Sequence, residues 1–232
     1  MTNNNILWLP LDLPPIDKEL TLDKIKKHYS YVPNLDRNQI KEYQEKKQHH
    51  LYAWDVFKIR IPNAPAKEVY KSQSDDISWN WTHQAKILCP NLIKYIKTHL
   101  PFKKIKYVTA INSKGKIPLH FDHTEECLDG EKQYYRNHDP CFYRLILDGK
   151  INVKSFYVYT KSLGKIYCVM PDLSPGWVMG SYSCAHGNDE EVSNQKLILY
   201  VMGDLDEELH RQLIDRSYLK YKKYSITKDN EV

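Results

Sequence analysis

Two histidines and one aspartate have the types and the spacing of a metal site. His120 and Asp122 are two positions apart at the end of the run Ile117–Asp122. Residues two apart on an extended segment point to the same face, so both side chains can reach one ion. His186, much later in the chain, can complete this face. Two imidazoles and one carboxylate leave coordination positions open, as non-haem Fe(II) sites require. We therefore predict that His120, Asp122 and His186 form a catalytic metal site.

Two basic residues lie in apolar surroundings. Lys196 opens the run Leu197–Val201, and Arg144 lies between Tyr143 and Leu145. Burying a cation without a partner is costly, so two such cations in separate strands favour a common anionic ligand. Either side chain can instead extend to solvent from an edge strand.

The composition is that of an ordinary globular protein. The chain has 232 residues, 41% of them hydrophobic, and a net charge of +5. A chain of this length is often a single domain, and no apolar run approaches the ~18 residues that a membrane helix needs. The mild basic excess suits an acidic ligand without requiring nucleic acid. Met1–Asn5 lacks the features of a signal peptide, so we expect a cytoplasmic protein with no membrane contact.

The spacing of the cysteines is not that of a disulfide framework or a zinc site. There are five, an odd number, and none is arranged as a CxxC pair. This argues against both structural disulfides and a thiolate zinc site. We expect free thiols.

The first hundred residues predict a mixture of elements. Ile6–Pro15 is apolar and broken by prolines, which indicates an extended arm or an edge strand. Apolar residues at helical spacing predict a helix over Leu20–Tyr29, and a second helix begins at Asn34 or Asp36. Val56–Pro62 alternates as a strand does, and a helix is expected within Cys89–Leu100.

From Ile105 onward, short β-like runs are separated by Gly, Pro, Asn and Asp. Many short strands with turns between them are typical of a barrel or sandwich. A helix over Leu205–Leu219 is expected to pack outside it. The runs are Ile105–Asn112, Ile117–Asp122, Cys141–Asp148, Ser155–Thr160, Lys165–Met170, Gly176–Tyr182 and Gln195–Met202.

The order of these motifs resembles a known superfamily. An HxD pair, a strand containing Arg144, a second histidine followed by Gly and Asn188, and a basic residue ten positions after that histidine occur in sequence. This pattern, over roughly residues 105 to 206, resembles the Fe(II)/2-oxoglutarate-dependent oxygenases. It is most similar to the aspartyl/asparaginyl β-hydroxylase and prolyl 4-hydroxylase-like branches.

The resemblance implies a fold and a reaction. The fold would be mainly β, a double-stranded β-helix (jelly-roll or cupin-like) with flanking α-helices. One domain, 1–232, would comprise a supporting and substrate region 1–104, a core 105–203 and a C-terminal helix and tail 204–232. Fe(II), 2-oxoglutarate and O2 would be required, with ascorbate as a possible reductant. Lys196 and Arg144, with Thr109, would bind the far carboxylate of 2-oxoglutarate.

The expected reaction is hydroxylation, with release of succinate and CO2. The substrate would be a peptide or protein side chain or an amino-acid-like small molecule. Specificity is expected to reside in the N-terminal hundred residues and in the loop Thr124–Asp139, which would form a lid, although a solvated loop explains its sequence nearly as well. Asn188 or a backbone carbonyl would hold the second ring nitrogen of a metal-bound histidine.

Several alternatives stay open. His123 or His138 could be the metal ligands, and His186 with the following Gly and Asn188 is equally typical of a turn. The protein could instead be an oxygenase that acts on nucleic acid, although no Arg occurs between His186 and Arg211. It could also be a cupin-like zinc or nickel protein without oxygenase activity.

Overall fold

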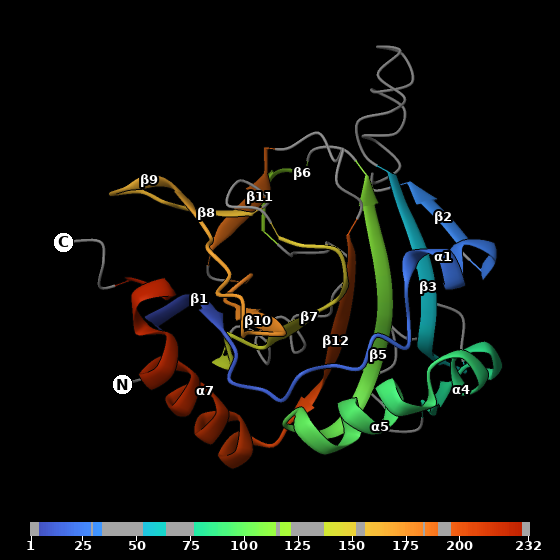
Figure 1. Cartoon of the computed structure of the whole chain (residues 1–232). Coiled ribbons are helices and arrows are strands. Elements are labelled where there is room, and N and C mark those ends of the chain that lie inside the picture. The colour runs from blue at the N-terminus through green and yellow to red at the C-terminus, as the bar shows by residue number, and fades with distance from the viewer. Residues whose placement is uncertain are drawn as a thin grey trace, which may run out of the picture.

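The computed structural model describes residues 5–28, 30–33, 53–63, 77–114, 117–121, 137–151, 156–182, 184–189 and 196–228. These residues form two antiparallel β-sheets with helices against the larger one (Figure 1). The expectation of a mainly β fold with flanking α-helices is therefore confirmed.

The larger sheet has nine strands among the described residues, in the order β13-β1-β10-β7-β12-β5-β3-β2, with β4 paired to β3. Every pairing in it is antiparallel. The strands are β1 (Ile6–Pro10), β2 (Ser30–Pro33), β3 (Ala53–Pro62), β4 (Trp79–Trp81), β5 (Phe102–Lys114), β7 (Phe142–Asp148), β10 (Gly176–Met179), β12 (Leu197–Leu205) and β13 (Ile226–Thr227).

The smaller sheet has four strands within the same described ranges, in the order β6-β11-β8-β9. They are β6 (Ile117–His120), β11 (Ala185–Asn188), β8 (Tyr157–Thr160) and β9 (Gly164–Tyr167). A hydrophobic cluster joins the two sheets. It contains Phe156 and Val158 beside β11, and Trp177 and Ile198 from the larger sheet. Sheet packs on sheet through these side chains, as in a sandwich.

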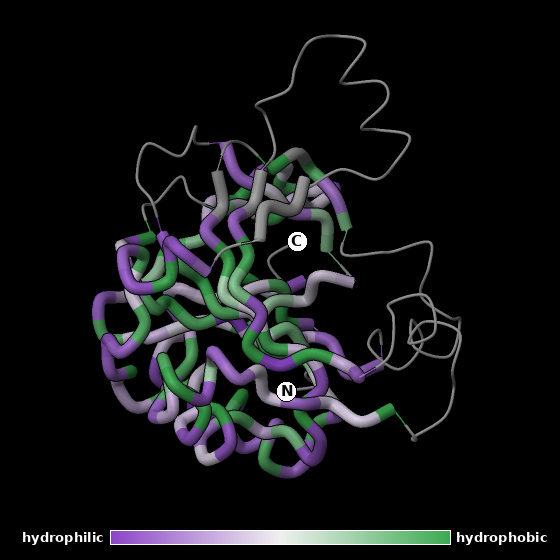
Figure 2. The backbone as a smooth tube through the Cα atoms, turned by 90° about the vertical axis from the view of Figure 1, so that its right-hand side faces the viewer, coloured by the Kyte–Doolittle hydropathy of each residue, from purple (hydrophilic) through white to green (hydrophobic). Residues whose placement is uncertain are grey.

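The other face of the larger sheet is covered by helices. The second hydrophobic cluster joins Leu145 and Leu199 of the sheet to Ile96 of α5 and Leu213 of α7. Figure 2 shows apolar segments through the centre of the molecule and hydrophilic ones along its outer turns. The helices are α1 (Leu22–Ile25), α4 (His83–Leu88), α5 (Pro90–His99) and α7 (Glu207–Tyr221), with 3-10 turns η2 (Lys26–His28) and η3 (Lys222–Tyr224).

Local signals explain the helix boundaries. Thr82 caps α4 by accepting from the Ala85 N–H at 3.2 Å, and α5 begins with Pro90 in its first turn, where no N–H is needed. Asp206 caps α7, and Glu207 and Glu208 follow in its first turn. No helix of the described residues is long and apolar enough to cross a membrane.

Most predicted elements lie where the sequence placed them. The strands expected over 105–202, the strand Val56–Pro62 and the helices within Cys89–Leu100 and Leu205–Leu219 are all present. The helix predicted over Leu20–Tyr29 is shorter, because α1 passes into a 3-10 turn. The helix predicted from Asn34 or Asp36 lies outside the described residues.

Two predictions were wrong. The segment Ile6–Pro15 was expected as an arm or edge strand, but β1 lies between β13 and β10. All five of its residues are buried, and the chain's own C-terminal β13 forms the edge instead. The turn reading of His186 and Asn188 was also wrong, since both belong to β11.

Candidate functional site

His120 and His186 lie directly opposite one another on β6 and β11. Their ring centroids are 4.4 Å apart, at an interplanar angle of 48°. Directly opposite residues of an antiparallel pair present their side chains on one face of the sheet. The fold therefore brings together the two histidines that the sequence separates widely.

This histidine pair faces the space between the two sheets. His186 is also directly opposite Val158 of β8, and Val158 belongs to the inter-sheet cluster. Cys184, two residues before His186, belongs to the same cluster. His186 is only 5% exposed. The rings thus lie at the inner face of the smaller sheet.

A backbone carbonyl orients the His186 ring. Its Nδ1 lies 3.2 Å from the Cys184 carbonyl oxygen, to which the ring N–H donates. The lone pair is then on Nε2, the atom with which a histidine held in this way binds a metal. Of the two partners expected from the sequence, the carbonyl is the one found.

Asn188 has a different role from the one expected. Its Oδ1 accepts from the Ile117 N–H at 2.8 Å. The side chain therefore ties β11 to β6 at the position where their register shifts. Such irregularities are common beside active sites, because they re-aim the neighbouring side chains.

The third predicted ligand, Asp122, lies outside the described residues, as do His123 and most of the loop Thr124–Asp139. Among the residues that the structure does describe, no group of three or more His, Cys, Asp or Glu could hold a metal. Asp122 therefore stays a prediction. The alternative ligand His138 is elsewhere, where its Nε2 lies 3.3 Å from Glu207 Oε1.

Lys196, the residue before β12, and Arg144 of β7 are both buried. Lys196 is 2% and Arg144 is 4% exposed, so neither side chain extends to solvent. The Lys196 ammonium lies 4.9 Å from the centre of the Phe156 ring, which belongs to the inter-sheet cluster. The Arg144 guanidinium lies 5.0 Å from the Tyr200 ring. Each cation thus has an aromatic ring close by.

Thr109 lies in the same row of the larger sheet. Tyr200 is directly opposite both Thr109 of β5 and Arg144 of β7, so these three side chains share a face. Thr109 is 1% exposed, and its Oγ1 has no hydrogen-bond partner among the described residues. A buried hydroxyl without a hydrogen-bond partner destabilises the fold unless a ligand or a water molecule bonds to it.

An aromatic wall borders the two cations. The rings of Trp8 and Trp177 stack with centroids 4.9 Å apart, and Phe156 lies 5.2 Å from Trp177. Trp177 is fully buried. Trp8 and Phe156 were not predicted as neighbours of the site. The uniformly apolar stretch around Trp8 gives no alternation from which its face could be read.

Within the described residues, the four cysteines are buried and free. Burial raises the pKa of the Cys168 thiol well above its usual value. A protonated, buried thiol is a poor metal ligand and a poor nucleophile. These four cysteines are thus free thiols, as the sequence predicts.

Comparisons with known proteins give distant structural similarity. No family model matches the chain, and no curated protein matches it. Among solved structures, it is similar to an oxidoreductase of the 2OG-Fe(II) oxygenase family from Burkholderia pseudomallei, with 10% identity, a TM-score of 0.38, and coverage of 83% of this chain and 92% of that one. It is also similar to IDO from Bacillus thuringiensis, with 9% identity, a TM-score of 0.33, and coverage of 84% and 99%. Identities and TM-scores this low do not indicate a function, which we infer instead from the residues of the site.

Proposed function

We propose that this protein is an Fe(II)- and 2-oxoglutarate-dependent dioxygenase, built on a double-stranded β-helix, that hydroxylates its substrate. The observation that carries the proposal is the His120–His186 pair, with rings 4.4 Å apart on paired strands. The pair faces a sheet that buries two cations. A metal beside an anion site is the arrangement that this chemistry needs.

His120, His186 and Asp122 would hold the iron. The residues fit this role because the two imidazoles share a face and the Cys184 carbonyl leaves Nε2 of His186 as the ligating atom. Asp122, two positions after His120, would supply the carboxylate. Iron bound there would use O2 to decarboxylate 2-oxoglutarate to succinate and CO2 and to insert the second oxygen atom into a substrate C–H bond.

Lys196, Arg144 and Thr109 would bind 2-oxoglutarate. Their contribution is a buried positive charge and an unsatisfied hydroxyl on the inner face of the larger sheet. A carboxylate placed there gains charge-assisted hydrogen bonds in surroundings from which water is excluded. Phe156 and Trp177 would keep these surroundings dry.

The proposed substrate is a peptide or protein side chain, or an amino-acid-like small molecule. The region 1–104 and the loop Thr124–Asp139 would select it. Nucleic acid is the weaker candidate, because no Arg occurs between His186 and Arg211. Ascorbate would serve as a reductant for the iron.

The test is uncoupled turnover. Purified protein reconstituted with Fe(II) should convert 2-oxoglutarate to succinate and CO2 slowly without substrate, and His120→Ala should lose this activity. A peptide library with mass spectrometric detection of added oxygen would then identify the substrate. Tight zinc or nickel binding with no conversion of 2-oxoglutarate would favour a cupin-like metal protein.

A further inference from the structure

Two tryptophans lie beside the buried cations. Trp177 of β10 is directly opposite Arg144 of β7, so these two side chains share a face of the larger sheet. Trp8 of β1 stacks on Trp177, with ring centroids 4.9 Å apart, and both residues are 0% exposed. The ring of Phe156 lies 5.2 Å from that of Trp177 and 4.9 Å from the Lys196 ammonium. The two indoles therefore border the proposed 2-oxoglutarate site.

The indole N–H groups of this stacked pair are the central observation. Nε1 of Trp8 and Nε1 of Trp177 are both buried, and neither has a hydrogen-bond partner in the part of the chain that the structure describes. Folded proteins normally pair buried donors of this kind. Two such donors in adjacent rings indicate that a bound ligand supplies the acceptor.

The polar side chains nearest the indoles cannot supply that acceptor. Lysine, arginine and tryptophan side chains donate hydrogen bonds and have no acceptor atom. Lys196 and Arg144 therefore cannot accept from either indole, and the inter-sheet cluster around the rings consists of apolar side chains and thiols. A ligand with several acceptor atoms and a negative charge satisfies all of these groups together.

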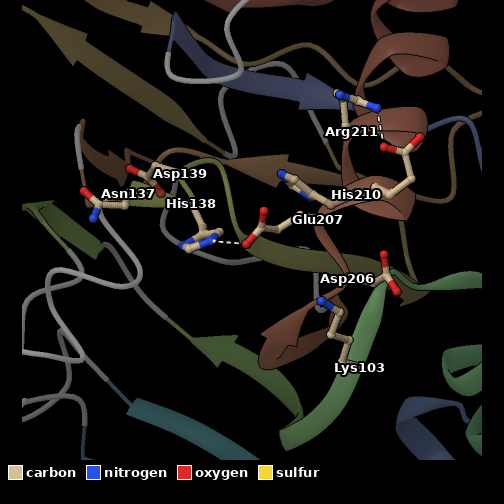
Figure 3. Close-up of a pocket in the computed structure, with 9 residues that line it drawn as sticks. Lys103, Asn137, His138, Asp139, Asp206, Glu207, His210 and Arg211 are labelled. Atoms are coloured by element: carbon tan, nitrogen blue, oxygen red, sulfur yellow. Dashed lines mark hydrogen bonds and ion pairs between the residues drawn. The ribbon is translucent and has the colours of Figure 1, made fainter.

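The surface depression at the start of α7 is a different place from this group of donors (Figure 3). His210, which lines the depression, contacts Tyr143, and Tyr143 faces the helix-covered side of the larger sheet. Arg144 faces the other side, since successive strand residues alternate. More acidic than basic side chains line the depression, so it repels an anion. The exposed Lys103 on its wall therefore serves as a control position.

We propose that the indole N–H groups of Trp8 and Trp177 donate to the carboxylate that Lys196 and Arg144 attract. The inference rests on the proposed function, in which this is the far carboxylate of 2-oxoglutarate. The two neutral donors add directional hydrogen bonds to the attraction of the two charges. The site thus includes a residue of the N-terminal strand β1, which the site predicted from the sequence lacks.

The test follows the indole N–H signals of metal-free protein by NMR, so that its result does not depend on iron or on turnover. The chain has five tryptophans, and each gives one such signal. The ligands are 2-oxoglutarate and glutarate, a dicarboxylate of the same length without the keto group. Glutaramide, which has this length but no charge, is the control ligand. Glutarate should shift the signals of Trp8 and Trp177 saturably and leave that of Trp81, which packs against the helix-covered cluster, in place.

Variants locate the donors. Trp177→Phe keeps an aromatic ring in the stack but removes the N–H, and it should weaken the binding of glutarate about tenfold or more, as should Trp8→Phe. Lys103→Gln, at the α7 depression, should leave the binding of glutarate unchanged. The indole signals of the parent protein remain informative if either tryptophan variant does not fold.

The outcomes separate this inference from the proposed function. The inference is overturned if neither dicarboxylate moves the Trp8 or Trp177 signal, if glutaramide binds as tightly as glutarate, or if both tryptophan variants fold and bind as the parent does. An iron chelate of 2-oxoglutarate that forms without indole shifts would refute the indole donors alone. Indole shifts with glutarate in a protein that forms no such chelate would support the donors and refute the oxygenase.

Discussion

Replacing Lys196 by methionine should weaken the binding of 2-oxoglutarate without lowering the stability of the fold appreciably. The side chain is 2% exposed, and its ammonium lies 4.9 Å from the Phe156 ring centre. Methionine has nearly the same length and volume but no charge. The substitution therefore removes the proposed partner of the 2-oxoglutarate carboxylate while the packing between the sheets is kept.

The expected loss of 2-oxoglutarate affinity follows from the burial of the Lys196 ammonium. Removing one partner of a buried, hydrogen-bonded ion pair costs ~3–5 kcal/mol. Each ~1.4 kcal/mol is a factor of ten in affinity, so the dissociation constant of 2-oxoglutarate should rise by roughly 100-fold to about 4000-fold. Arg144 would still face the same ligand, which favours the lower end. The free energy of unfolding should fall by less than ~1 kcal/mol or rise, because an apolar residue avoids the desolvation of the ammonium.

The assay is equilibrium binding of 2-oxoglutarate to the Fe(II)-loaded protein without oxygen, alongside urea unfolding. Lys58→Met is the matched control, since Lys58 is directly opposite Thr109 in the same sheet but is exposed. Lys58→Met should change neither the dissociation constant of 2-oxoglutarate nor the free energy of unfolding appreciably. If Lys196→Met folds and binds 2-oxoglutarate as the parent does, Lys196 is not the carboxylate partner.

Three further outcomes are expected. His186→Ala should abolish Fe(II) binding, measured by anaerobic dialysis. Gly187→Ala should weaken Fe(II) binding and destabilise the fold by ~1–3 kcal/mol, because the added Cβ would lie 2.6 Å from the Tyr157 hydroxyl oxygen and 2.7 Å from the Ile117 carbonyl oxygen. As pH falls from 6.5 towards 4, the unfolded chain takes up a proton that buried His210 excludes, so the free energy of unfolding should drop by up to ~3 kcal/mol, and His210→Gln should reduce this drop.

Controls make these outcomes decisive. Leu119→Ala alters an exposed residue next to His120 and should leave iron binding intact. Wild-type iron affinity in His186→Ala would remove His186 from the ligand set. Unchanged iron affinity and unfolding free energy in Gly187→Ala would mean that neither depends on the close approach of β6 and β11. An equally steep pH dependence in His210→Gln would assign the acid sensitivity to other groups.

Much of the fold could be predicted because its signals are local. Alternation and turn residues located the strands from Ile105 onward, and Pro90 marked the start of α5. Lys196 was recognised as unusual because it opens an apolar run, and Arg144 because it lies within one; both are buried.

The errors have long-range causes. Gly187 and Asn188 have turn-like composition, yet they form β11 because Asn188 bonds the Ile117 N–H of β6 and the Tyr157 ring lies against Gly187. Neither contact is visible in the local sequence. Likewise, β1 is not an edge strand because β13, from the other end of the chain, pairs with it. Its run of apolar residues was the signal for a covered strand, and the prolines obscured it.

The central claim is that the His120–His186 pair holds iron that also binds 2-oxoglutarate. An anaerobic titration of the metal-free protein with Fe(II), and then with 2-oxoglutarate, tests it through the visible charge-transfer absorption of the iron chelate. We predict that the absorption appears at one equivalent of iron and is lost in His120→Ala. Iron binding without this absorption, or absorption that persists in His120→Ala, would contradict the claim.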